Sequence, residues 1–197
     1  MQLPGVVKYR FVLIGFLSLI LIASPGLAVA YYFGNYSLEK IGPPPQPGQE
    51  VILVTGSTGG LGREVARRLG SQGAHVIVHG RNSERGNELV EQIIAEGSGS
   101  ARFYRADFSS LQQIRALGER ILTDYSRLDV LVNNAGFGSA PDQRMISEDG
   151  HELRFQVNYL AGFLLTKMLM PLILDSQPSR IVNVSSAAQT AIDFDDV

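Results

Sequence analysis

Three glycines, spaced as Gly56, Gly60 and Gly62, have the chemistry of a phosphate-binding turn. They follow four consecutive apolar residues, 51–54, which predict a strand buried on both faces, and they precede a helical pattern that opens at 64–69. In that context the first glycine permits a tight turn, the second lets the backbone approach a pyrophosphate, and the third lets the helix pack close to the strand. The helix start adds N–H groups and a partial positive charge. We expect dinucleotide phosphates to bind along this run, where the alternative is an ordinary glycine loop; the candidate residues are Gly56, Ser57, Gly60, Leu61 and Gly62.

Arg81 follows the second predicted strand, 75–79, where many dinucleotide sites carry an acidic residue for the ribose hydroxyls. This chain has no acid at that point, and the planar guanidinium of Arg81 suits a 2′-phosphate. Arg63, near the start of the first helix, can reinforce the contact. The pattern favours NADP(H) over NAD(H), against the alternative that Arg81 is an ordinary solvated loop residue.

Two further strand ends carry polar or small residues. Asp107 follows the third strand and could pair with the adenine amino group, with Phe108 packed against the ring, but it could equally be the N-cap of the next helix. The fourth strand ends in Asn133-Asn134-Ala135-Gly136, where small residues let a ribose or nicotinamide approach and the amides can tie strands together. Asp107, Asn134, Ala135 and Gly136 are therefore candidate cofactor-binding residues.

Strand and helix patterns alternate along the chain after residue 50. The predicted strands cover 51–54, 75–79, 102–106, 130–132 and 180–184, and the predicted helices cover 83–96, a segment that opens at 109–111, and 151–174. This alternation predicts an α/β fold, a doubly wound parallel Rossmann sheet with right-handed crossovers, incomplete at its C-terminus. Ligands of such sheets bind beyond the carboxyl ends of the strands, where the residues above lie.

Several motifs together resemble one family. They are Thr55-Gly56-xxx-Gly60-Leu61-Gly62, Asn133-Asn134-Ala135-Gly136, Asn158 within 157–160, and Ile181-Val182-Asn183-Val184-Ser185-Ser186. In order and spacing they are similar to the motifs of the short-chain dehydrogenase/reductase superfamily. The sequences of segments 148–152, 155–160 and 163–166 resemble its retinol-dehydrogenase-like branch. The resemblance covers about residues 50 to 197.

The resemblance implies hydride transfer between NADP(H) and a small-molecule alcohol or carbonyl, with an apolar retinoid-, steroid- or lipid-like substrate favoured. Ser186 matches the family serine that hydrogen-bonds the substrate oxygen, and Asn158 matches the asparagine whose helix backbone holds a water in the proton relay. The family also implies a tyrosine acid/base whose pKa is lowered by a lysine in a Tyr-xxx-Lys motif. Whether the full-length protein forms a homo-oligomer is left open.

No tyrosine or lysine follows Ser186 in this sequence. Tyr159 and Lys167 do not have the family's spacing and belong to the preceding helix. We therefore expect a truncated sequence, inactive as it stands, whose full product is a reductase. Two alternatives remain: a non-catalytic NADP(H)-binding protein and an inactive fragment.

Residues 1–33 are predicted to form a segment separate from the α/β domain. No charged side chain occurs from Phe11 to Phe33, a run longer than the roughly 20 residues that cross a bilayer as a helix. We favour a single-pass membrane anchor; the alternative is a signal peptide with cleavage after 28–30, followed by export. The side of the membrane stays open, and the Pro-rich segment 34–49 is predicted to be a semi-rigid linker to the NADP-binding domain at 50–197.

The composition excludes several other chemistries. The 197 residues contain no cysteine, so disulfides, thiolate catalysis and cysteine-based zinc sites are excluded. The net charge of −2 gives no sign of a nucleic-acid footprint. His75 and His79 lie in one predicted strand at a spacing that does not suit a metal pair, and we expect structural roles for both.

Overall fold

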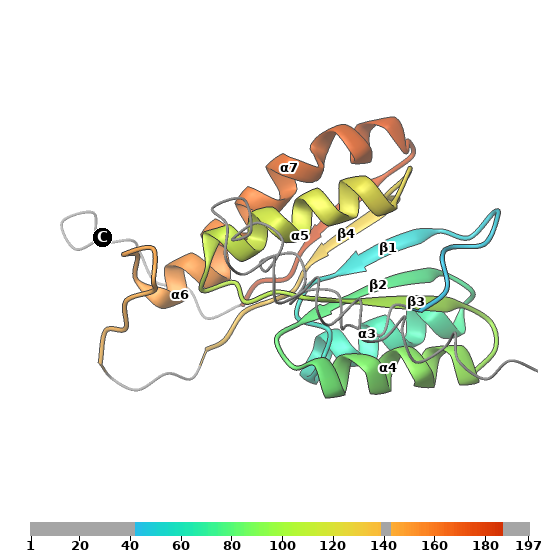
Figure 1. Cartoon of the computed structure of the whole chain (residues 1–197), viewed down its shortest axis with the longest axis horizontal. Coiled ribbons are helices and arrows are strands. Elements are labelled where there is room, and N and C mark those ends of the chain that lie inside the picture. Colours follow the sequence, from blue (N-terminus) through green and yellow to red (C-terminus); the bar gives the residue numbers. More distant parts are fainter. Residues whose placement is uncertain (1–41, 139–142, 187–197) are drawn as a thin grey trace, which may run out of the picture. The chain divides into compact units, whose positions relative to one another are not determined.

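The computed structural model describes residues 42–138 and 143–186, which form a three-layer α/β domain (Figure 1). Five parallel strands lie in the order β3-β2-β1-β4-β5. Helices α3 and α4 cover one face of the sheet, and α5 and α7 cover the other. The strands are β1 Val51–Val54, β2 His75–Gly80, β3 Ser100–Arg105, β4 Val130–Asn133 and β5 Arg180–Asn183; the helices are α3 Gly60–Ser71, α4 Ser83–Ala95, α5 Leu111–Asp124, α6 Leu153–Phe155, η1 Gln156–Leu160 and α7 Ala161–Asp175. The predicted parallel sheet is confirmed.

Burial explains why the apolar runs became strands. Every residue of β1 and β2 is buried, because helices cover both faces of the sheet and leave no polar side for alternation. Side chains that alternate along β1 feed two cores: Val51 and Leu53 pack toward α5 and α7, whereas Ile52 and Val54 pack toward α3 and α4. The core therefore continues on both sides of the strand that carries the glycine turn at its end.

The predicted helix at 151–174 is a composite element. A short α6 and α7 are joined by η1, a π-helical turn, so the helical segment covers 153–175. This is the helix of the described residues that is long and apolar enough to span a membrane, although Leu165 and Leu169 are fully buried against the domain core. The membrane segment predicted at 11–33 lies outside the described residues.

The described part of the Pro-rich segment is attached to the domain. Gln49 donates from Nε2 to the Gly73 carbonyl (3.0 Å) and accepts from the Ser100 hydroxyl (2.8 Å). The Arg102 guanidinium donates to the Gly42 carbonyl at 3.1 Å. Residues 42–49 thus lie along the amino-terminal ends of the sheet.

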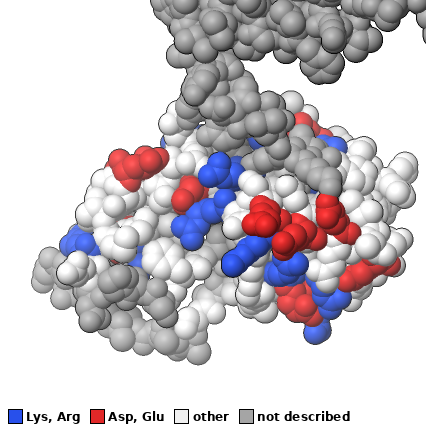
Figure 2. Space-filling model, turned by 60° about the horizontal axis from the view of Figure 1, so that its bottom comes forward, with Lys and Arg blue, Asp and Glu red and all other residues white. Residues whose placement is uncertain are grey.

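The surface of the α3 and α4 layer has a mixed charge. Figure 2 shows acidic and basic side chains interleaved on this face. Much of this pattern is a set of ion pairs: Arg67 contacts Glu64 (3.1 Å) and Glu96 (3.2 Å), and Arg68 contacts Glu64 (2.6 Å). The two arginines together hold the pKa of Glu64 low, at about 2.

His75 begins β2 inside a buried polar cluster. Its Nδ1 lies 2.7 Å from the Ser100 hydroxyl and its Nε2 lies 3.0 Å from the Tyr125 hydroxyl, so the predicted structural role is confirmed. Burial lowers the pKa of His75 from 6.5 to about 4. The folded ring therefore stays neutral at a pH where the unfolded chain is already protonated.

This pKa shift makes the folding stability depend on pH. Between pH 6.5 and about 4 the unfolded state binds the extra proton, so the free energy of unfolding falls as the pH falls. His75 contributes a slope of up to about 1.4 kcal/mol per pH unit. Urea unfolding at several pH values should show a shallower slope for His75→Gln than for the wild type. Equal slopes for His75→Gln and wild type would contradict the assignment.

Candidate cofactor site

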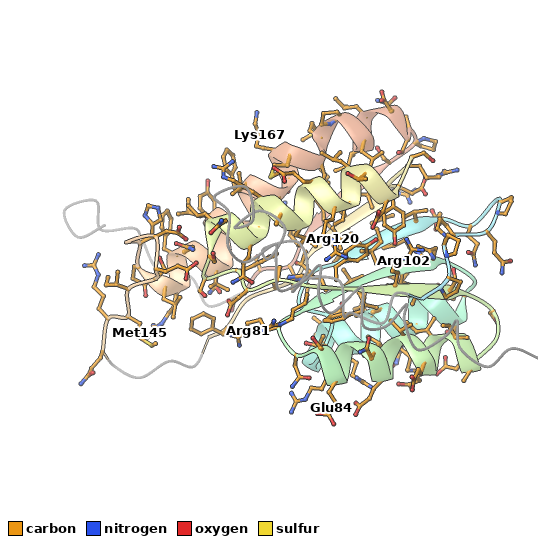
Figure 3. All side chains as sticks on the ribbon, in the orientation of Figure 1. Arg81, Glu84, Arg102, Arg120, Met145 and Lys167 are labelled. Atoms are coloured by element: carbon orange, nitrogen blue, oxygen red, sulfur yellow. The ribbon has the colours of Figure 1, made fainter. Side chains whose placement is uncertain are left out.

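A cleft of about 990 Å³ lies at the carboxyl end of the sheet. The cleft is lined by the turns after β1, β2, β3 and β4, by residues 145–148, and by Leu153 of α6 and Val157 of η1. Figure 3 shows Arg81 and Met145 toward one side of the molecule and Arg102 toward the other. The cleft is therefore where a doubly wound sheet binds its ligand.

The glycine turn has the backbone shape that its sequence predicts. Gly56 has φ +67° and Gly60 has φ +55°, both in the left-handed region that favours glycine. A Cβ on Gly62 would lie 2.4 Å from Asn134 Nδ2 and 2.5 Å from the Gly56 carbonyl oxygen. Gly62 thus lets α3 pack against the turn and the end of β4. These contacts fix how the first turn of α3 meets the cleft.

Helix α3 begins four residues earlier than the sequence pattern predicts, at Gly60 rather than at Glu64. Its N-cap residue, Gly59, has no side chain to accept from the first N–H groups of the helix. The helix start therefore meets the cleft without a capping side chain, as an anion site requires. Leu61, at 62% exposure, lies beside it on the cleft wall.

Ser57 does not line the cleft. It is fully buried, and its hydroxyl donates to the Val54 carbonyl (2.8 Å) and accepts from the His79 N–H (2.9 Å). Its own N–H donates to the His79 carbonyl at 2.8 Å. Ser57 therefore supports the turn from beneath, and the next residue, Thr58, faces the cleft in its place.

Arg81 and Asp107 lie together on the cleft wall. Arg81 Nη1 is 3.8 Å from Asp107 Oδ2, and the Arg81 side chain is 75% exposed. Arg105 donates from Nε to the Arg81 carbonyl (3.1 Å) and so fixes the backbone at this point. An exposed guanidinium held beside the cleft suits a phosphate that arrives from solvent. Arg63 instead turns to α4, where it donates to the Arg85 carbonyl (3.3 Å), so the reinforcement predicted for it is not seen.

Asp107 is not the N-cap of α5. The cap is Ser110, whose hydroxyl accepts from the Gln113 N–H, whereas Asp107 Oδ1 accepts from the Ser109 N–H at 2.9 Å in a local turn. Phe108 is only 4% exposed, and its ring is stacked on His79 with centroids 4.4 Å apart. The face of the Phe108 ring that stacks on His79 is thus covered by protein. Of Asp107 and Phe108, Asp107 is the residue that stays available to an adenine.

The end of β4 is tied to the glycine turn. Asn134 donates from Nδ2 to the Thr55 carbonyl (2.9 Å), and the N–H groups of Asn134 and Ala135 both donate to Thr55 Oγ1 (3.0 Å each). The predicted role of the amides in joining strands is confirmed. Thr55 is buried, and its hydroxyl also donates to the Val132 carbonyl. It therefore supports the turn through three groups in β4 and just after it, a role that the sequence did not reveal.

Asn158 lies in the π-helical turn η1. Its Oδ1 accepts from the Phe137 N–H and its Nδ2 donates to the Phe137 carbonyl, each at 3.0 Å. The side chain thus ties η1 to Phe137, and a π-turn changes the hydrogen-bond partners of the backbone carbonyls around it. This arrangement agrees with the backbone role that the resemblance implies.

Gln156 holds this turn in place. It is fully buried, accepts from the Ser147 hydroxyl (2.6 Å), and donates to Asp149 Oδ2 (2.7 Å) and the Phe108 carbonyl (3.3 Å). Asp149 also accepts from the N–H of Leu111 at the start of α5 (2.7 Å). The Gln156 side chain therefore links η1 to segment 147–149 and to the loop that follows β3. Its pattern along the chain gave no signal of this role.

The model of the family described as short chain dehydrogenase matches residues 50–192. The chain belongs to this family. Within it, the similarity to retinol dehydrogenases identifies the retinol-dehydrogenase-like branch. Mouse retinol dehydrogenase 13 is 40% identical over 154 residues, which cover 77% of this chain and 45% of that protein. The Arabidopsis thaliana dehydrogenase/reductase SDR family member FEY is 37% identical over 167 residues, covering 81% of this chain and 44% of that protein. The chain spans about half the length of the curated relatives it matches.

Solved short-chain dehydrogenases share the fold. A metagenomic short-chain oxidoreductase in complex with NADP superposes with a TM-score of 0.63 at 33% identity, covering 73% of this chain and 65% of that one. A Sphingobium yanoikuyae short-chain dehydrogenase in complex with NADPH gives a TM-score of 0.62 at 25% identity, covering 70% and 54%. Both neighbours hold a nicotinamide cofactor.

Ser186 and three tyrosines of the described residues are the side chains to compare with the catalytic groups that the resemblance implies. Ser186 is exposed beyond the end of β5, whose Asn183 is paired in register with Asn133 of β4. The tyrosines within the described residues are poorly suited to act as the acid/base. Burial raises the pKa of Tyr104 to about 12 and raises that of Tyr125 further, and Tyr159 is stacked between Phe155 and Phe163.

Proposed function

We propose that this chain is the NADP(H)-binding part of an oxidoreductase that moves a hydride between the cofactor and an alcohol or carbonyl carbon. The observation that carries the proposal is the shared cleft wall: the glycine turn, the uncapped start of α3 and the exposed Arg81 line one cavity. The turn and helix start supply N–H groups for a pyrophosphate, and Arg81 supplies a fork for a 2′-phosphate. The NADP(H) complexes of the structural neighbours support the same cofactor.

Each candidate residue has a distinct task in this proposal. The nicotinamide supplies or accepts the hydride when it is bound. Gly56, Gly60, Leu61 and Gly62 bind phosphate through the backbone, while Asn134, Ala135 and Gly136 leave room for the ribose and nicotinamide. Asp107 recognises the adenine, Ser186 hydrogen-bonds the substrate oxygen, and the Asn158 carbonyl holds a water in the proton relay. Ser57 contributes by holding the turn.

An apolar substrate agrees with the exposed apolar side chains that line the cleft. Three large apolar side chains line the cavity while remaining exposed: Leu61 at 62%, Met145 at 43% and Ile146 at 57%. Exposed apolar groups around a cavity favour a hydrophobic ligand. The uncharged run from Phe11 to Phe33 further suggests a membrane anchor, which would bring the domain close to lipid-soluble substrates.

The proposal is tested by cofactor titration of the chain itself. Fluorescence of NADPH should change on binding, with an affinity at least about tenfold higher than that for NADH, since one charge-assisted contact to the 2′-phosphate gives a difference of this size. A folded chain that binds neither nucleotide would refute the proposed function.

A further inference from the structure

His79 lies directly beneath the glycine turn. It is 2% exposed, and its Nδ1 accepts from the Gly56 N–H at 3.1 Å. Its backbone is bonded to Ser57 in both directions, since the His79 N–H donates to the Ser57 hydroxyl and the His79 carbonyl accepts from the Ser57 N–H. One residue of β2 therefore holds the first two residues of the turn.

The hydrogen bond fixes the protonation state of the ring. Because the Gly56 N–H donates, Nδ1 must be without a proton, and the neutral ring then carries its proton on Nε2. Burial keeps the ring neutral by lowering the pKa of His79 to about 4, although the Ala106 backbone and the Asp107 carboxylate act in the opposite direction. In a charged ring Nδ1 would also carry a proton, and this N–H would face the Gly56 N–H. Two donors cannot form a hydrogen bond, so this contact exists only with neutral histidine.

The Gly56 N–H donates to His79 Nδ1, and the Gly56 carbonyl accepts from Asn134 Nδ2 at 3.4 Å. The φ of Gly56, +67°, excludes most side chains, and an added Cβ would lie 2.8 Å from Ala135 Cα. Without an acceptor at His79, the Gly56 N–H would lose this partner in a partly buried place, which favours a different peptide orientation. The turn that follows leads straight into α3, so a change in this peptide changes where the first helical N–H groups point.

We propose that His79 is a positioning residue of the dinucleotide site: its neutral ring holds the Gly56 amide, and with it the glycine turn, in the conformation that receives the pyrophosphate. The inference rests on the proposed function for its ligand. It assigns a role in cofactor binding to a residue that the sequence argument treated as structural only. Because the pyrophosphate is common to both nucleotides, His79 should affect NADPH and NADH alike, in contrast to Arg81.

Two substitutions separate the hydrogen bond from the packing. His79→Asn places a carbonyl oxygen near the position of Nδ1 and keeps an acceptor, whereas His79→Leu fills the space against Phe108 without one. We expect His79→Leu to weaken NADPH and NADH about tenfold each, the effect of one buried hydrogen bond, and His79→Asn to stay within about threefold of the wild type. Urea unfolding of each variant measures the folded fraction, so that affinity is compared among folded molecules.

A readout without ligand keeps this inference distinct from the proposed function. Hydrogen exchange of the Gly56 amide should be faster in His79→Leu and close to wild type in His79→Asn. If the wild type ignores NADPH while these exchange rates differ as expected, the cofactor assignment fails and the hold on the turn stands. If the wild type binds NADPH but both variants bind as it does, or both lose equal affinity, the inference is wrong.

If His79→Leu does not fold, ¹⁵N spectra of the wild-type His79 imidazole test the inference instead. A proton on Nδ1 at neutral pH would exclude the contact with the Gly56 N–H.

Discussion

Gly62→Ala should remove NADPH binding and lower the free energy of unfolding by about 3 kcal/mol, at the upper end of the usual cost of overpacking. The added Cβ would lie 2.5 Å from the Gly56 carbonyl oxygen, which belongs to the backbone of the same turn and cannot move aside alone. It would also lie 2.4 Å from Asn134 Nδ2, which is bonded to the Thr55 carbonyl. Relief of the clash must therefore displace α3 from the turn. Urea unfolding and NADPH titration measure the two effects.

Two neighbouring glycines provide graded controls for this substitution. Gly59 has an extended backbone, with φ −167°, and open space where a Cβ would lie, so Gly59→Ser should change stability by less than about 0.5 kcal/mol. Gly60 also faces open space but has φ +55°, so Gly60→Ala should cost about 1 kcal/mol from backbone strain alone. If Gly62→Ala proved no more damaging than Gly59→Ser, the close approach of α3 to the turn would be wrong.

Arg81→Asp should reverse the preference between the two nicotinamide cofactors. Loss of a charge-assisted contact to the 2′-phosphate weakens NADPH binding by about 1.5–3 kcal/mol, or about 10- to 150-fold. Repulsion between the new carboxylate and the phosphate adds to that loss, while a carboxylate at this position can accept from the ribose hydroxyls of NADH. Parallel titrations with NADPH and NADH measure the ratio of the two dissociation constants.

The control for this reversal is the same charge change elsewhere. Arg115 is exposed on α5 and lies outside the cleft lining, so Arg115→Asp should leave both affinities nearly unchanged in buffer of moderate ionic strength. An equal loss of NADPH and NADH affinity in Arg81→Asp would assign Arg81 to general support of the loop rather than to the 2′-phosphate.

Strands β1 and β2 were predictable because they are buried on both faces. Runs such as 51–54 and 76–78 are apolar without alternation, and their spacing along the chain leaves room for the crossover helix between them. The start of α3 was placed four residues late because glycines obscure a helix start that is set by the packing of Gly62. The strand ends likewise identified the region of the cleft correctly, since parallel topology brings them to one edge.

Side-chain direction within the cleft could not be obtained in the same way. Ser57 and Thr58 are adjacent in a polar turn, and only the fold decides that Ser57 faces His79 while Thr58 faces the cavity. The π-helical turn at Asn158 is held by Gln156, whose partners Ser147, Asp149 and Phe108 come from two other segments of the chain. Contacts of this kind join distant parts of the sequence and leave no local pattern.

The central claim is that the glycine turn presents the start of α3 to the cofactor pyrophosphate, and amide chemical shifts report on it residue by residue. We predict that NADPH added to the ¹⁵N-labelled chain shifts the backbone signals of residues 58–62 most strongly, followed by those of Arg81. NADP-dependent shifts confined to other surfaces, or a folded chain whose signals at 58–62 do not move at saturating NADPH, would contradict the account.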